Sequence, residues 1–115
     1  EDRIPKELIS LFHPSVQPYL RSYLTTDPAE LIAKVECPTL IISGGRNIQI
    51  SVDNAERLLA SSKGAKHISF ADMSHVLKDA TTDDRIEQML SVYTNSQLPL
   101  TEGLADAIVE FLKSL

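Results

Sequence analysis

One histidine in this 115-residue sequence lies where hydrolytic enzymes often carry a general base. His75 follows an alternating, strand-like segment and begins the loop that continues as Val76-Leu77-Lys78. An imidazole can take a proton from a serine hydroxyl near neutral pH and later return it to a leaving group. A lone loop histidine is more often structural or solvated, so the residue alone leaves both interpretations open. No Gly-x-Ser-x-Gly nucleophile elbow occurs in the sequence.

The other residue types that bind metals are few and widely spaced. His13 and His67 have no ligand spacing with each other or with His75, and Cys37 is the only cysteine, so we expect no metal site and no cofactor. A single cysteine also excludes an internal disulfide. We expect its small side chain to be buried, because it starts an apolar run after Pro38. The ring of His67 is expected at the surface, at the start of a strand.

Composition excludes several classes of protein. The chain is long enough for one globular domain with its own core and too short for two. A formal net charge of -5 argues against a nucleic-acid partner, since such proteins carry a basic face. No apolar run approaches the ~18 residues that a membrane span needs, so we expect a soluble protein without a membrane partner. The cellular location is left open, with the cytoplasm favoured.

Helix-spaced apolar residues mark the first third of the chain. Residues 4–12 and 16–24 are each predicted to form a short helix. Asp27-Pro28-Ala29-Glu30 predicts a further helix start, with an aspartate cap, proline in the first turn and a glutamate that reaches back to the cap. We expect this helix to end at about Val35.

The middle of the chain predicts a strand, a helix and a second strand. Residues 39–43 form a continuous apolar and β-branched run, typical of a parallel strand covered on both faces. Residues 51–62 have helical spacing, and residues 67–71 alternate. This order predicts a right-handed βαβ unit with a parallel sheet.

Two further helices are predicted toward the C-terminus, at 83–93 and 104–115. Their apolar positions, expected to face a core, are Ile86, Met89, Leu90 and Tyr93 in the first, and Leu104, Ala107, Ile108, Phe111, Leu112 and Leu115 in the second. Two strands do not make a stable covered sheet alone. We therefore expect a fragment, an obligate dimer or both, and the start at Glu1 without a methionine fits part of a longer protein.

Four segments carry a resemblance to a known family. Asp27-Pro28-Ala29-Glu30, the run 37–44, Gln49-Ile50-Ser51-Val52 and the run 73–78 together look like the C-terminal part of an α/β-hydrolase. The likeness covers nearly the whole chain, including the ending Leu98-Pro99-Leu100. It implies an α/β fold in which residues 1–26 are cap-like helices and residues 27–115 are the C-terminal portion. The family's chain order of nucleophile, acid and histidine would place the nucleophile elbow before residue 1.

The resemblance gives His75 the role of general base and places the catalytic acid at the position of Asn47. An amide is neutral and can hold the ring in the wrong tautomer. Three explanations stay open: the acid has moved to another strand end, the protein is a catalytically weakened relative, or the alignment of the motif is shifted. Asp53 is expected in the first turn of the crossover helix, and Asp72 could brace the loop that carries His75.

The resemblance implies a serine hydrolase that acts on a carboxylic ester or similar small acyl substrate. Leu11, Phe12, Tyr19 and Tyr23 are the visible candidates for the apolar lining of its pocket. Without a nucleophile the 115 residues should be inactive on their own. We also expect a homo-oligomer formed through the exposed edge of the sheet. The alternative, which Asn47 favours, is a non-catalytic binding or interaction module on a hydrolase scaffold.

Overall fold

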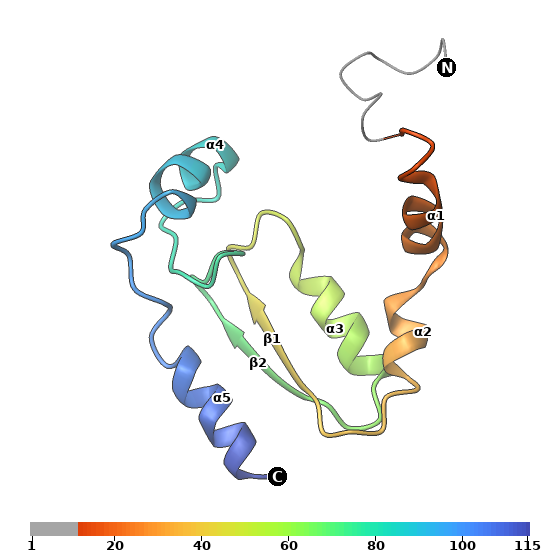
Figure 1. Cartoon of the computed structure of the whole chain (residues 1–115). Helices are drawn as coiled ribbons and strands as arrows, with labels where there is room; N and C mark the ends of the chain where they lie inside the picture. The colour runs from red at the N-terminus through yellow and green to blue at the C-terminus, as the bar shows by residue number, and fades with distance from the viewer. Residues whose placement is uncertain (1–11) are drawn as a thin grey trace.

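The structure is a computed structural model that describes residues 12–115 (Figure 1). Its elements in chain order are the helices α1 (Gln17–Thr25) and α2 (Pro28–Ile32), the strand β1 (Leu40–Gly44), the helix α3 (Val52–Ser61), the strand β2 (Lys66–Phe70), the helix α4 (Arg85–Gln88), which continues as the π-helix η2 (Met89–Tyr93), and the helix α5 (Leu104–Lys113). The helix predicted at 4–12 lies almost wholly outside the described residues. The other predicted elements are all present, with ends shifted by a few residues.

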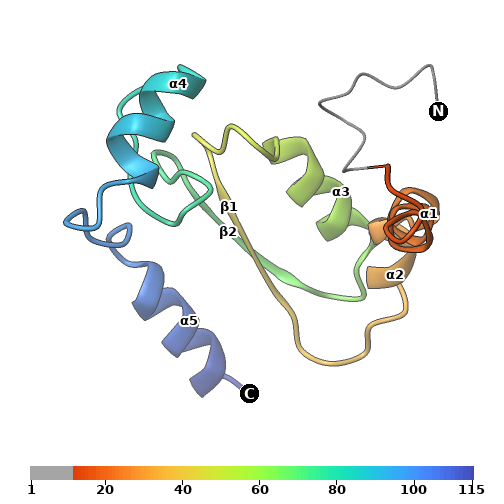
Figure 2. The ribbon, with the colours of Figure 1, turned by 45° about the horizontal axis from the view of Figure 1, so that its top comes forward.

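The two strands form a parallel sheet, as the sequence predicted. Leu40 pairs with Lys66 at one end of the sheet and Gly44 pairs with Phe70 at the other. The helix α3 connects the strands and packs against β1, whereas α5 lies on the opposite side of the strand pair (Figure 2). Lys66 of β2 contacts α5, with its Nζ 3.1 Å from the hydroxyl of Ser114. The fold is therefore a small α/β arrangement with helices on both sides of the strand pair.

The start of α2 follows its sequence signature. Oδ1 of Asp27 accepts a hydrogen bond of 2.9 Å from the backbone N–H of Ala29, and Pro28 occupies the first turn, where its missing N–H costs nothing. The other carboxylate oxygen of Asp27 forms an ion pair with Arg57 of α3. The helix ends at Ile32, three residues earlier than predicted, because the chain tightens there into a short turn. Asp27 thus both begins α2 and ties it to α3.

The buried apolar core is small, and this corrects the predicted burial. Strand β1 is half-buried along most of its length instead of being covered on both faces. In the segment formed by α4 and η2, Ile86 is 71% exposed and Leu90 is 70% exposed, while Gln88 is 0% exposed. The radius of gyration over Cα atoms is 17.6 Å, whereas a compact domain of this length would have about 13 Å. The apolar stripes therefore face outward because no described element lies against them.

The outer side of α5 repeats this pattern. Leu104 at its first turn is buried, but Ile108, Leu112 and Leu115 are exposed. These residues form one apolar stripe, and the described residues cover it only at its start. Among residues 12–115, no helix combines the length and the apolar character that crossing a bilayer requires.

Two smaller predictions were wrong. Cys37 is exposed, because it lies in the connection before β1 and not in the strand itself. The ring of His67 is half-buried, because its Nε2 lies 2.8 Å from the hydroxyl of Ser43 on the neighbouring strand. This pair ties the two strands together across the sheet.

Candidate functional site

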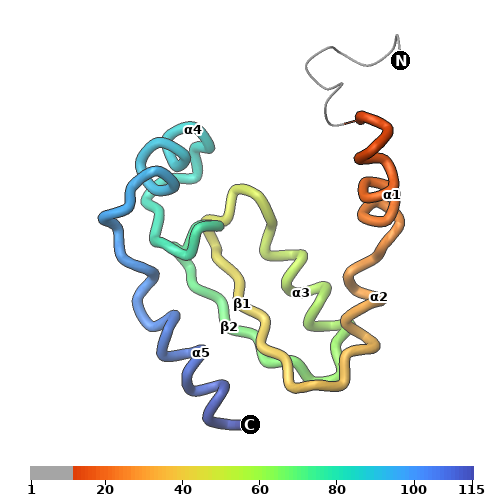
Figure 3. The backbone as a smooth tube through the Cα atoms, in the orientation of Figure 1, coloured from red at the N-terminus to blue at the C-terminus, as the bar shows by residue number. Residues whose placement is uncertain are grey.

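The candidate site forms where both strands end. Gly44 pairs with Phe70, so the turn 45–50 and the loop 71–80 leave the sheet at the same edge (Figure 3). The backbone N–H of Gly45 donates to the carbonyl of Phe70 at 2.8 Å, and that of Arg46 donates to the carbonyl of Met73 at 3.2 Å. The backbones of the turn and the loop are therefore joined directly at the end of the sheet.

Glycine is required at this junction because two backbones approach closely. A Cβ added to Gly44 would collide with the carbonyl of Met73, and one added to Gly45 would collide with the carbonyl of Ala71. Neither glycine has a positive φ, so the requirement is for space. The glycine pair lets the turn press against the loop that carries His75.

The structure brings Asn47 and His75 together. Nδ2 of Asn47 lies 3.3 Å from Nδ1 of His75. The amide oxygen of Asn47 accepts hydrogen bonds from the backbone N–H groups of Gln49 at 3.0 Å and Ile50 at 3.1 Å. These two bonds fix the amide with its nitrogen toward the ring. An amide nitrogen only donates, so Nδ1 of His75 is the acceptor.

This direction of donation decides which nitrogen of the neutral ring carries the proton. With Nδ1 accepting, the proton lies on Nε2. A histidine that takes a proton from a serine through Nε2 needs the opposite form, with its proton on Nδ1 facing a carboxylate. The pair therefore has the spatial arrangement of an acid and its histidine, while its hydrogen bond runs in the reverse direction.

The loop that carries His75 is tightly closed. Met73 and Ser74 are buried, and the hydroxyl and the backbone N–H of Ser74 both donate to the carbonyl of Lys78, at 2.7 and 2.8 Å. Met73 also forms an isolated antiparallel β-bridge with Asp79. His75 is exposed at the tip of this loop. Its backbone is therefore held by the hydrogen bonds of the loop, while its ring is open to solvent.

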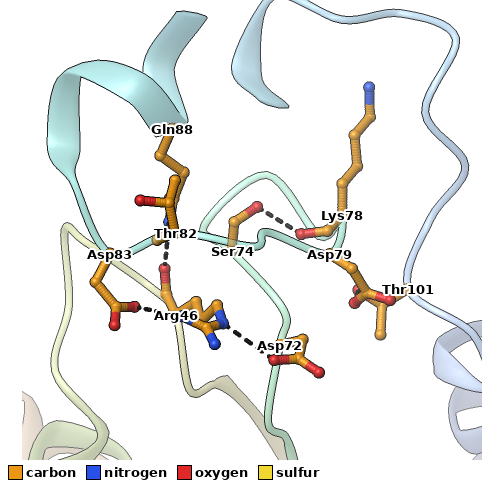
Figure 4. Close-up of polar contacts among 9 residues, drawn as sticks. All are labelled: Arg46, Asp72, Ser74, Lys78, Asp79, Thr82, Asp83, Gln88 and Thr101. Atoms are coloured by element: carbon orange, nitrogen blue, oxygen red, sulfur yellow. Dashed lines mark hydrogen bonds and ion pairs between the residues drawn. The ribbon is translucent and has the colours of Figure 1, made fainter. Parts of the chain in front are cut away.

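The segment before α5 anchors the same loop. Nζ of Lys78 donates to the carbonyl of Asn95 at 2.6 Å. Thr101 donates twice, through its backbone N–H to the carbonyl of Leu77 at 2.9 Å and through its hydroxyl to Asp79 at 2.7 Å. Figure 4 shows Thr101 beside Asp79 and Ser74 turned toward Lys78. The histidine loop is thus held from two sides, by the turn after β1 and by the segment 95–101.

Arg46, the residue before Asn47, links the turn to two acidic residues. Its Nε lies 3.0 Å from Asp72 and its Nη1 lies 3.1 Å from Asp83 (Figure 4). The hydrogen bond to Asp72, followed by the charge of Asp83, raises the pKa of Arg46 above its ordinary value. Asp72 therefore braces the loop, as predicted. Asp53 lies in the first turn of α3, also as predicted.

Gln88 was missed by the sequence analysis. Its Nε2 donates to the carbonyls of Arg46 at 3.0 Å and Thr82 at 2.9 Å, so it joins α4 to the turn that carries Asn47. Its Oε1 is buried and has no hydrogen-bond partner among the described residues. No local sequence pattern identifies such a residue. One of the carbonyls that it binds is 42 positions away in the sequence, and the other lies in an irregular segment before α4.

Only some of the residues predicted to line an apolar substrate pocket lie near the Asn47–His75 pair. Tyr23 lines a cavity of about 380 Å³ together with Gln49 and Ile50, the residues that bind the amide oxygen of Asn47. Tyr19 stacks on Tyr23 with ring centroids 6.2 Å apart, and both rings line a neighbouring hollow of about 440 Å³. Phe12 is exposed, and Leu11 lies outside the described residues.

The comparisons with known proteins give no match: no family model, no curated protein and no solved structure is similar to this chain. Within residues 12–115, no group of three or more histidine, cysteine, aspartate or glutamate side chains is placed to hold a metal ion. Any function assigned to the chain therefore rests on the geometry of its own residues.

Proposed function

We propose that this chain is the C-terminal portion of an α/β-hydrolase-type serine hydrolase that acts on a carboxylic ester or a similar acyl substrate. His75 is the general base, and Asn47 occupies the position of the acid. The serine nucleophile comes from residues outside this sequence, so the 115 residues alone have no hydrolase activity.

A single observation carries this proposal: the contact of 3.3 Å between Asn47 and His75, whose positions are 28 residues apart. In the proposed fold, the acid and the histidine follow neighbouring parallel strands in this order. The paired ends of β1 and β2 bring the turn and the loop together, and within these two segments it is Asn47 and His75, the positions that the resemblance assigns to the acid and the base, whose side chains meet. Ligand and catalytic sites of open α/β sheets form at this edge.

The test uses the longer protein in which this chain is the C-terminal part. A fluorophosphonate probe should label a serine, and the substitution His75→Ala should remove both labelling and hydrolysis of a short-chain ester. The matched control is His13→Ala, because His13 is exposed and, within residues 12–115, its ring bonds to the nearby Ser15. Labelling that is unchanged in the His75 variant would refute the assignment.

A second candidate function has its own support in the direction of the hydrogen bond. With Nδ1 occupied by Asn47, the exposed Nε2–H of His75 is a donor, which suits the binding of a carbonyl or carboxylate group better than proton abstraction. Under this alternative the chain is a non-catalytic binding module on a hydrolase scaffold. A strand followed by Gly-x-Ser-x-Gly upstream of Glu1 would favour the enzyme, and its absence from the gene would favour the module.

A further inference from the structure

The helix α4 turns a glutamine inward and its apolar neighbours outward. Gln88 is completely buried, although Ile86 and Leu90 on the same helical segment are largely exposed. Burial of a carboxamide is unfavourable unless its polar atoms are paired, and Oε1 of Gln88 lacks a partner within the described structure. A leucine or methionine would fill the same space without an unpaired oxygen. The value of this residue therefore lies in the bonds that its Nε2 donates.

One of those bonds holds the peptide group that leads into Asn47. The carbonyl of Arg46 accepts from Nε2 of Gln88 at 3.0 Å, and the N–H of the same peptide group, which belongs to Asn47, donates to the carbonyl of Gly44 at 3.2 Å. The plane of this peptide is thus fixed at both ends. The direction in which Asn47 leaves the backbone depends on that plane.

The second bond from Nε2 reaches the carbonyl of Thr82 at 2.9 Å. Thr82 precedes Asp83, which pairs with Arg46. Gln88 and Arg46 therefore bind the same short segment from two sides, as Figure 4 shows. This closes a ring of contacts around the turn, in which Gln88 is the only fully buried side chain of the four residues.

We infer that Gln88 is a positioning residue for the Asn47–His75 pair: it holds the Arg46–Asn47 peptide so that the amide of Asn47 faces the ring. The inference rests on the proposed function only in treating that pair as the reactive one. Gln88 itself does not touch the pair through its side chain. Its effect passes through the backbone of the turn.

The test reads the histidine ring directly, without any activity assay. The chain is produced with ¹⁵N only in its three histidine side chains, and long-range proton–nitrogen spectra are recorded at about pH 9, where imidazoles are neutral. In the wild type, the ring of His75 should be protonated on Nε2, with the shift of an acceptor at Nδ1. In Gln88→Met, the two nitrogen shifts of His75 should move toward each other as the ring exchanges between tautomers.

An internal reference signal and a control variant make this result specific. The ring of His67 is held by Ser43 within the strand pair, before the turn that Gln88 binds, and should not move. The matched control is Gln97→Met, because Gln97 is exposed and should leave His75 unchanged. An unaltered His75 spectrum in a folded Gln88→Met protein would overturn the inference. Equal movement of His67 would also overturn it, since that would show a general loosening of the fold.

A measurement on the wild type covers the case in which Gln88→Met does not fold. The side-chain amide protons of Gln88 should exchange with solvent at least about tenfold more slowly than those of Gln97. Equal exchange rates would show that Nε2 is not held and would overturn the inference. A failure of the proposed function would appear elsewhere, as absent serine labelling, and would leave these ring and exchange measurements valid.

Discussion

The amide nitrogen of Asn47 lies 3.3 Å from Nδ1 of His75, and the amide oxygen of the same side chain accepts two backbone N–H groups of the turn. An aspartate at this position could keep the same two backbone bonds with one oxygen. Its other oxygen would then face Nδ1 and accept a hydrogen bond from the Nδ1–H of the ring, which places the proton of the neutral imidazole on Nδ1. The turn is therefore already shaped for a carboxylate.

Asn47→Asp should raise ester hydrolysis by the full-length protein. In one serine protease with a Ser-His-Asp triad, exchange of the aspartate for its amide lowers turnover about 10⁴-fold, so the reverse change should recover part of such a factor. The measurement is kcat with an activated ester. Asn47→Ala serves as the control and should give no gain. An Asn47→Asp rate equal to the wild-type rate would mean that a carboxylate elsewhere already serves His75.

Gly44→Ala should destabilise the chain by about 1–3 kcal/mol, the usual cost of forcing extra volume into a packed position. The added Cβ would collide with the carbonyl of Met73, which belongs to the loop carrying His75. Urea denaturation of the wild type and the variant measures the difference in the free energy of unfolding. Gly64→Ala is the comparison, because a Cβ there meets no atom within 4 Å and only the φ of 112° is strained. A larger loss at Gly64 than at Gly44 would contradict the close approach.

Leu77→Gly should leave the stability unchanged or raise it by up to about 1 kcal/mol. Leu77 has a φ of 63°, the left-handed region, which costs a residue with a side chain about 1–2 kcal/mol, whereas glycine adds about 0.5–1 kcal/mol of unfolded-state entropy. The side chain is 44% exposed, so glycine also loses the packing of its covered part, which offsets some of the gain. Leu100→Gly is the control: an exposed leucine without a positive φ should only lose stability. Equal losses at both positions would contradict strain at Leu77.

The isolated chain should self-associate in solution, with a second copy covering the uncovered edge and apolar surfaces. Ile108→Glu combined with Leu112→Glu should shift the mass measured by light scattering toward the monomer, because both residues lie on the exposed side of α5. Ala105→Glu, an exposed position on the same helix, should have little effect. A stable monomer of the unmodified chain would refute the prediction.

Local signals in the sequence were good guides to the elements. Asp27 and Pro28 mark the start of α2, and the apolar run before Gly44 marks β1, because helix capping and short apolar runs involve only a few neighbouring residues. The contact between Asn47 and His75 followed from the family resemblance, since nothing within either segment shows that the two would meet. Parallel strand ends then explain the contact in physical terms.

Orientation and long-range polar contacts could not be predicted in the same way. The spacing of Ile86 and Leu90 shows which face of a helix favours burial, but not whether anything covers that face. Gln88 binds the carbonyl of Arg46, a residue 42 positions away, through a side chain that in most proteins is solvated. Contacts of this kind depend on the assembled fold and have no local signature.

The outward apolar stripes of η2 and α5 also make the thermodynamics of this chain depend on its surroundings. Anything that binds the folded form at a hundred times its dissociation constant adds about 2.7 kcal/mol to the free energy of unfolding. If a second copy covers these stripes as predicted, the melting temperature of the chain should rise with protein concentration.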